Sequence, residues 1–83
     1  MKFLAEINIM PLETLLDPQG KAVSSSMKNI NLKEVSNVRI GKHITLEVES
    51  ENEETASVKV KEACEKILCN QIMEYFDYSI KKL

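Results

Sequence analysis

A glycine–lysine pair, Gly20-Lys21, comes nearest in this chain to a known chemical motif. A phosphate-binding P-loop requires a further glycine five positions before the pair and a Ser or Thr directly after the lysine. Leu15 and Ala22 occupy those two positions, so the motif fails. The N-terminus of a helix still attracts anions, so a direct ligand contact stays open here beside a structural cap or an interface.

The residues around this pair predict the start of a helix. Asp17 is a favourable N-cap, and Pro18 suits the first helical position because its missing N–H would be unpaired there. Gly20 has no such explanation, since glycine costs about 1 kcal/mol relative to alanine inside a helix. We therefore expect another backbone or a ligand to approach Gly20 closely.

The other reactive side chains do not combine into a catalytic or metal-binding group. His43 is the one histidine, and no Ser or Cys stands at a spacing suited to a nucleophile that it could activate. The two cysteines and one histidine match no zinc template, and Cys64 falls on an apolar helical stripe with Val60 and Ile67, which favours core packing. Cys69, five positions after Cys64, is expected on a different face, so a disulfide between them is not expected. We expect neither catalytic residues nor a metal site.

Two clusters of charged residues can be interpreted either as solvated surface or as binding sites. The segment Arg39-Ile40-Gly41-Lys42 places two cations at the tip of an expected hairpin. It is either a solvated turn or a docking point for an acidic partner surface or a phosphate. The acidic run over 47–54 is explained by solvation, by protection of a strand edge and by the positive N-terminus of the next helix.

Length and composition limit the possible functions. The 83 residues form one domain, 1–83, which buries only about 60–65% of its unfolded surface, so we expect an oligomer or a partner to add burial. A net charge of −2 and 5% aromatic residues argue against nucleic-acid binding. No stretch suits a membrane span or a secretory signal, which indicates a cytoplasmic protein with reduced thiols.

Hydrophobic periodicity predicts the order β-α-β-β-α-β. That order is typical of an α+β, ferredoxin-like antiparallel sheet with both helices on one face. The pair Gly41-Lys42 predicts a type II′ hairpin between the two middle strands. The expected elements are strands over 2–10, 35–40, 43–49 and 72–80, and helices over 18–30 and 55–68.

The face of the sheet opposite the helices is expected to carry apolar residues at one end. Its candidates are Leu4, Met10, Met73 and Tyr75, mixed with polar residues along the strands. An exposed apolar patch of this kind marks an interaction surface. We therefore expect the sheets to pack in a homo-oligomer.

Three blocks of the sequence carry a family resemblance: residues 16–23 (LDPQGKAV), 38–42 (VRIGK) and 64–70 (CEKILCN), followed by a final strand with Tyr75. In order and spacing they resemble the PurS family, the small subunit of phosphoribosylformylglycinamidine (FGAM) synthase in purine biosynthesis. The resemblance implies a noncatalytic subunit that bridges a glutaminase subunit and an ATP-dependent synthetase subunit. Ammonia released from glutamine would then reach formylglycinamide ribonucleotide without escaping.

The resemblance also implies self-association to a dimer or tetramer. ATP and magnesium would be used by the complex, with no cofactor bound by this chain. The residues expected to contact partners are Asp17, Gln19, Gly20, Lys21, Arg39, Gly41 and Lys42. The alternative function is a free-standing ferredoxin-like regulatory module that binds a small metabolite.

Overall fold

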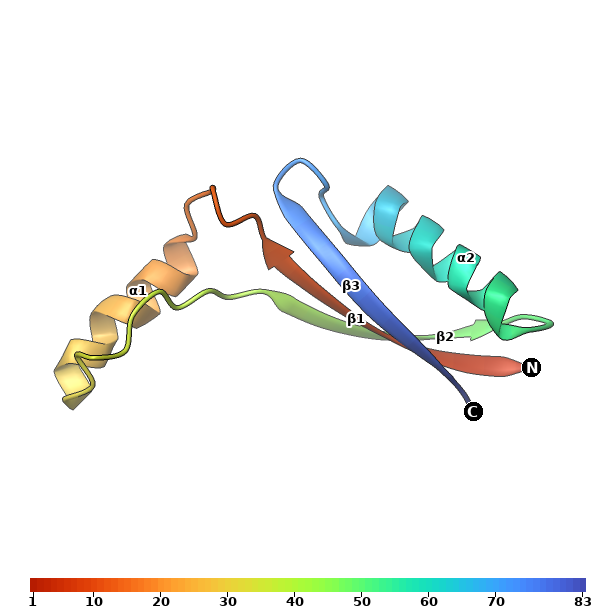
Figure 1. Ribbon diagram of the computed structural model, residues 1–83, viewed down its shortest axis with the longest axis horizontal. Coiled ribbons are helices and arrows are strands. Elements are labelled where there is room, and N and C mark those ends of the chain that lie inside the picture. Colours follow the sequence, from red (N-terminus) through yellow and green to blue (C-terminus); the bar gives the residue numbers. More distant parts are fainter.

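The computed structural model describes residues 1–83 as an antiparallel sheet with two helices (Figure 1). The central strand β1 (Lys2–Pro11) lies between β2 (Lys42–Glu49) and β3 (Glu74–Lys82). The α+β class and the antiparallel sheet are therefore confirmed. The helices are α1 (Pro18–Met27), continued by a 3₁₀ turn over Lys28–Ile30, and α2 (Glu53–Ala63), continued by a π-helical turn over Cys64–Leu68.

The core lies between the sheet and α2. Period-two alternation turns the apolar residues of β1 to one face, where Ala5, Ile7 and Ile9 are completely buried. Val60 and Cys64 of α2 pack against them. One helix is only about 10 Å wide, so it covers the central strand and leaves both neighbours incompletely covered. The half-exposed apolar residues are Ile44, Leu46 and Val48 on β2 and Phe76, Tyr78 and Ile80 on β3.

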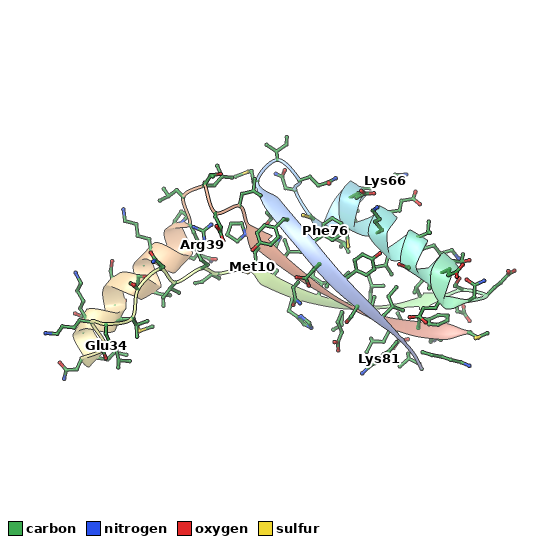
Figure 2. The ribbon with its side chains drawn as sticks, in the orientation of Figure 1. Met10, Glu34, Arg39, Lys66, Phe76 and Lys81 are labelled. Carbon is green, nitrogen blue, oxygen red and sulfur yellow. The ribbon has the colours of Figure 1, made fainter.

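The segment between β1 and β2 forms an arm that projects from the sheet. Figure 1 shows α1 beyond the end of the sheet, away from α2. Figure 2 shows Glu34 at the tip of the arm and Lys81 toward the other end of the molecule, which measures 51 × 27 × 14 Å. Gly20 is the only buried residue of α1. The prediction that both helices pack on one face of the sheet is therefore wrong.

The strand predicted over 35–40 does not form, so the sheet has three strands. Asn37 adopts a left-handed conformation with φ 56°, which interrupts an extended run. The N–H groups of Val38 and Ile40 bond to side chains of the Asp17–Ser24 region, not to a neighbouring strand. The prediction of a type II′ hairpin is also wrong, because Gly41 lacks the positive φ that this turn requires.

A π-helical turn sets the end of the second helical segment. The N–H of Cys69 donates to the carbonyl of Cys64 at 3.0 Å, a bond that spans five residues. The wider turn leaves Ile67 80% exposed, although it was predicted on the buried stripe. It also returns Cys69 to the core cluster that holds Cys64, so the prediction that the two cysteines occupy different faces is wrong. Both thiols are free.

The other face of the sheet has no helix over it. Its middle is polar: Asn8 accepts from His43 Nδ1 at 2.7 Å and donates to Asp77 at 3.0 Å, which links all three strands. Its apolar end is as predicted, since Met10 pairs with Tyr75, and Met73 lies just before β3. Neither α1 nor α2 has the length and apolar content of a membrane-crossing helix.

Gly41 is expected to be intolerant of a side chain. A Cβ at this position would overlap the carbonyl oxygen of Ile9 and the sulfur of Met10. We predict that Gly41→Ala destabilises the fold by about 1–3 kcal/mol, the usual cost of overpacking, as measured by urea unfolding. Ser25→Ala, at an exposed position of α1, is the control and should be nearly neutral. Equal stability of the two variants would contradict the close approach.

Candidate interaction site

The carboxylate of Asp17 joins the arm to the sheet. It caps α1 by accepting the N–H of Gly20 at 3.0 Å through Oδ1, as the sequence predicted for an N-cap. Its other oxygen, Oδ2, accepts the N–H of Ile40 at 2.8 Å. Ile40 lies two residues before β2, so one side chain holds the start of the helix against the strand that leaves the arm.

Backbone hydrogen bonds and a nearby cation lower the pKa of Asp17 below its ordinary value of 3.8. The largest is the N–H of Gly20, followed by the N–H of Ile40, and the Arg39 guanidinium contributes further. Burial of the side chain, which is 8% exposed, acts in the opposite direction by raising the pKa. The N–H groups outweigh it because they favour the charged carboxylate directly. Asp17 is therefore ionised at neutral pH.

Arg39 holds the loop that leads into α1. Its guanidinium donates to the carbonyl of Leu12 at 2.7 Å and to those of Pro11 and Leu15 at 3.3 Å each. Its Nε lies 4.0 Å from Asp17 Oδ2. The sequence analysis placed Arg39 at the tip of a hairpin, in either a solvated turn or a docking point. In the structure most of its donors already have partners inside the chain.

Gly20 and Ser24 let the returning segment lie directly on α1. A Cβ on Gly20 would overlap the carbonyl oxygen of Val38, so the predicted close approach of a backbone is confirmed. The hydroxyl of Ser24, one turn later, accepts the N–H of Val38 at 3.0 Å. Helix propensity does not explain this serine, but its hydrogen bond does.

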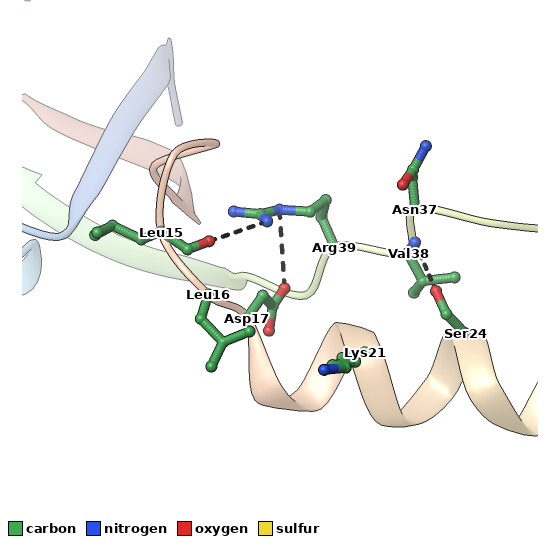
Figure 3. A pocket seen from close by; sticks show the side chains of 8 residues that line it. All are labelled: Leu15, Leu16, Asp17, Lys21, Ser24, Asn37, Val38 and Arg39. Carbon is green, nitrogen blue, oxygen red and sulfur yellow. Dashed lines mark hydrogen bonds and ion pairs between the residues drawn. The ribbon is translucent and has the colours of Figure 1, made fainter.

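The structure brings the predicted contact residues together, although they come from segments about twenty positions apart. Lys21 and Arg39 line an open groove of about 300 Å³ between α1 and the returning segment (Figure 3). Gln19, Gly41 and Lys42 line a second groove of about 220 Å³ on the adjoining surface. Asp17 lies between the two and lines both. Gly20, in contrast, is buried beneath Val38.

Several residues of this surface were missed by the sequence analysis. Leu16 is 74% exposed and lines both grooves, with Leu15 beside it. Pro11, Leu15, Leu16 and Met73 line a third groove of about 280 Å³ together with Asn70 and Glu74. Consecutive leucines in a segment expected to be a loop were the available signal. We call the surface around these three grooves the junction surface.

Lys42 differs from Arg39 in being available to a partner. Its Nζ lies 3.6 Å from Glu74 Oε2, and its side chain is 57% exposed. His43 follows Lys42 in the sequence, but its ring bonds to Asn8 on the uncovered face of the sheet. It therefore does not line the junction surface. The junction surface thus offers charged, amide and apolar groups for binding. It does not bring together a nucleophile and a base.

Comparisons with known proteins agree with this architecture. The sequence model of one family, described as "PurS: Phosphoribosylformylglycinamidine (FGAM) synthase", matches residues 4–82. The PurS subunit of phosphoribosylformylglycinamidine synthase from Bacillus subtilis is 39% identical over 86% of this chain and 83% of its own length.

Solved structures give the same relationship. PurS from Thermus thermophilus superposes with a TM-score of 0.87 and 31% identity, over 100% of this chain and 99% of that one. A chain of the PurLQS structure from Thermotoga maritima superposes with a TM-score of 0.83 and 34% identity, again over 100% and 99%.

Because Asp17 is ionised in the folded protein, we expect the free energy of unfolding to fall at acidic pH. Because folding lowers its pKa, its contribution is complete above about pH 5 and is lost as the pH falls through the folded-state pKa. We expect Asp17→Asn to be less stable than the parent at pH 7 and to lose less stability on acidification. Glu13→Gln removes the same charge from an exposed side chain of the same loop and serves as the control. Urea midpoints measured from pH 7 to pH 3 that shift equally in both variants would contradict the role of Asp17.

Proposed function

The chain belongs to the PurS family and is thus a subunit of phosphoribosylformylglycinamidine synthase, and within that enzyme we propose that it bridges the other two subunits. The observation that carries this proposal is its match, over the entire chain, to a component of the PurLQS structure. Its partners would be the ATP-dependent synthetase subunit and the glutaminase subunit. The bridge would hold their sites in fixed register so that ammonia passes to formylglycinamide ribonucleotide.

The junction surface supports a binding role for this chain. Two segments that are distant in sequence, 17–21 and 39–42, meet there and are fixed by Asp17 and Arg39. A preorganised surface loses little conformational entropy on binding, which favours a rigid connector between two larger proteins. Gln19, Lys21 and Lys42 are the predicted contact residues whose side chains remain exposed there.

The chemistry of the enzyme would belong to its partners. We propose that this chain contributes no catalytic residue and binds no cofactor, while ATP and magnesium act on the synthetase subunit. Its two thiols are poor nucleophiles because burial raises the pKa of both Cys64 and Cys69. We propose that the protein is located in the cytoplasm, where the substrates of the synthase would be available.

Reconstitution tests the bridging function. The synthetase and glutaminase subunits of the same organism are mixed with and without this chain, and glutamine-dependent formation of formylglycinamidine ribonucleotide is measured. We expect activity only when the chain is present, whereas ammonia-dependent turnover by the synthetase should not need it. Equal glutamine-dependent rates without the chain would overturn the proposal. A melting shift of the isolated chain with a small metabolite would then favour a regulatory module.

A pair of lysine substitutions tests the junction surface. Lys42→Ala should leave the fold intact, because an exposed ion pair contributes only about 0–1 kcal/mol. We predict that it weakens assembly with the partner subunits by about tenfold, since a charge contact at an interface is typically worth about 1.4 kcal/mol. Lys61→Ala, on an exposed position of α2, is the matched control. Titration calorimetry that gives the same affinity for both variants would rule out this surface as the contact.

A further inference from the structure

The two cysteines lie in the same part of the core although five positions separate them. Cys64 begins the π-helical turn, and Cys69 directly follows it. On an α-helix, residues five apart point to different faces, because each residue turns the chain by about 100°. The π-helical turn winds more loosely, so the N–H of Cys69 reaches the carbonyl of Cys64 at 3.0 Å. Both side chains then belong to one cluster of buried residues.

Packing does not explain why the helix ends in this way. The π-helical turn leaves Ile67 80% exposed and buries Cys69, which is only 6% exposed. An isoleucine side chain has more apolar area than a cysteine, so burying Ile67 beside Val60 and Cys64 would be the more favourable arrangement. Turns of this kind are rare and frequently occur at functional sites. The chain thus gives up hydrophobic burial and gains the proximity of two thiols.

The contacts between the two cysteines fit a pair that a covalent bond can join. Their backbones are held together by the hydrogen bond at 3.0 Å, and a disulfide requires Cα atoms about 4.4–6.8 Å apart. Burial raises the pKa of the Cys64 thiol, and the neighbouring Cys69 raises it further, which indicates that the two sulfur atoms lie close together. Both thiols are free. The chain therefore holds two free thiols on the same side of a single helical turn.

We propose that Cys64 and Cys69 form a reversible disulfide within the chain when a peroxide oxidises it. The less completely buried thiol, Cys69, would react first. Its sulfur takes one oxygen atom from hydrogen peroxide, which gives a sulfenic acid and releases water. The Cys64 sulfur then attacks the Cys69 sulfur, so that the S–S bond forms, the S–O bond breaks and a second water leaves. The two thiols together lose two electrons and two protons, and the peroxide is reduced to water.

The burial of the thiols determines which oxidant can react and how fast. Hydrogen peroxide is not much larger than water, so it can reach Cys69 when the end of the helix opens locally. Burial raises the pKa of Cys69, and the nearby Glu74 raises it further, so little thiolate is present at neutral pH. The reaction is therefore slow and responds to sustained exposure to peroxide. This inference goes beyond the proposed bridging function and does not depend on it.

The disulfide would also restrain the turn that follows the helix and leads into β3 (Figure 1). Asn70 comes directly after Cys69, and its carbonyl accepts the N–H of Met73 at 2.9 Å and that of Glu74 at 2.7 Å. These three residues of the turn line the third groove of the junction surface. A bond from Cys69 to Cys64 fixes the first residue of this wall to the helix. We therefore expect the turn to open less often in the oxidised chain.

The test is a map of tryptic peptides from the parent chain after treatment with hydrogen peroxide. Lys66 lies between the two cysteines, so trypsin places Cys64 in the peptide 62–66 and Cys69 in the peptide 67–81. We expect the two peptides to be joined, the intact chain to lose the mass of two hydrogen atoms, and dithiothreitol to separate the peptides. Unlinked peptides from the treated chain would overturn the proposal. So would a product of two linked chains, at twice 9.4 kDa on a non-reducing gel, in place of the bond within one chain.

Thermal unfolding tests whether the folded chain accommodates the disulfide. The oxidised parent should melt at least about 4 °C higher before treatment with dithiothreitol than after it, because a disulfide that fits the fold stabilises it. Dithiothreitol does not reverse methionine oxidation, so the comparison isolates the disulfide. Cys69→Ala, which keeps a small apolar side chain at this position, should show no such difference. A lower melting temperature of the oxidised parent, or an equal difference in Cys69→Ala, would contradict the proposed bond.

Amide hydrogen exchange measures the effect on the turn. The N–H groups of Met73 and Glu74 should exchange at least about tenfold more slowly in the oxidised parent than in the reduced parent. Equal exchange rates in the two forms would contradict the restraint of the turn. Because reconstituted synthase activity is scored separately, absence of the disulfide leaves the bridging function standing, and the reverse is also true.

Discussion

The position of the arm depends on the ionised carboxylate of Asp17. One oxygen caps α1 and the other holds Ile40 just before β2, so both ends of the arm are fixed at one side chain. Arg39 adds bonds to the carbonyls of the loop that leads into α1, and Figure 3 shows the one to Leu15. Without these ties, a helix that buries only Gly20 would have little to orient it. Two grooves of the junction surface are lined by residues from both sides of these ties.

The short length of the chain explains why so much of its apolar surface remains exposed. The core has room for one helix over the central strand, and two flanking apolar rows remain half-exposed. Completing this core within the chain would require the arm to fold back, but the bonds of Asp17 and Ser24 direct it away. The unsatisfied surface is then available to other molecules. A subunit that binds larger partner proteins is consistent with this architecture.

Local patterns predicted the regular elements well, and tertiary contacts decided the rest. Alternation identified β1, and the Asp17-Pro18 signal identified the start of α1. The strand over 35–40 was predicted from apolar alternation, but Val38 and Ile40 bond to side chains of the helical arm instead. Ile67 was misplaced because a π-helical turn has no clear sequence signature. The structure brings most of the predicted contact residues to one surface, and their contact with partners stays a prediction. Arg39 bonds to backbone carbonyls of the loop before α1, which no sequence pattern reveals.

The most direct test of the Asp17 tie is amide hydrogen exchange at Val38 and Ile40, followed by NMR. These residues lie outside regular secondary structure, so their protection depends on the side chains of Ser24 and Asp17. The account predicts slow exchange at both positions in the parent chain, and fast exchange at Ile40 in Asp17→Ala. Exchange in the parent as fast as at Lys33 and Glu34, whose amides have no partner in the chain, would contradict it.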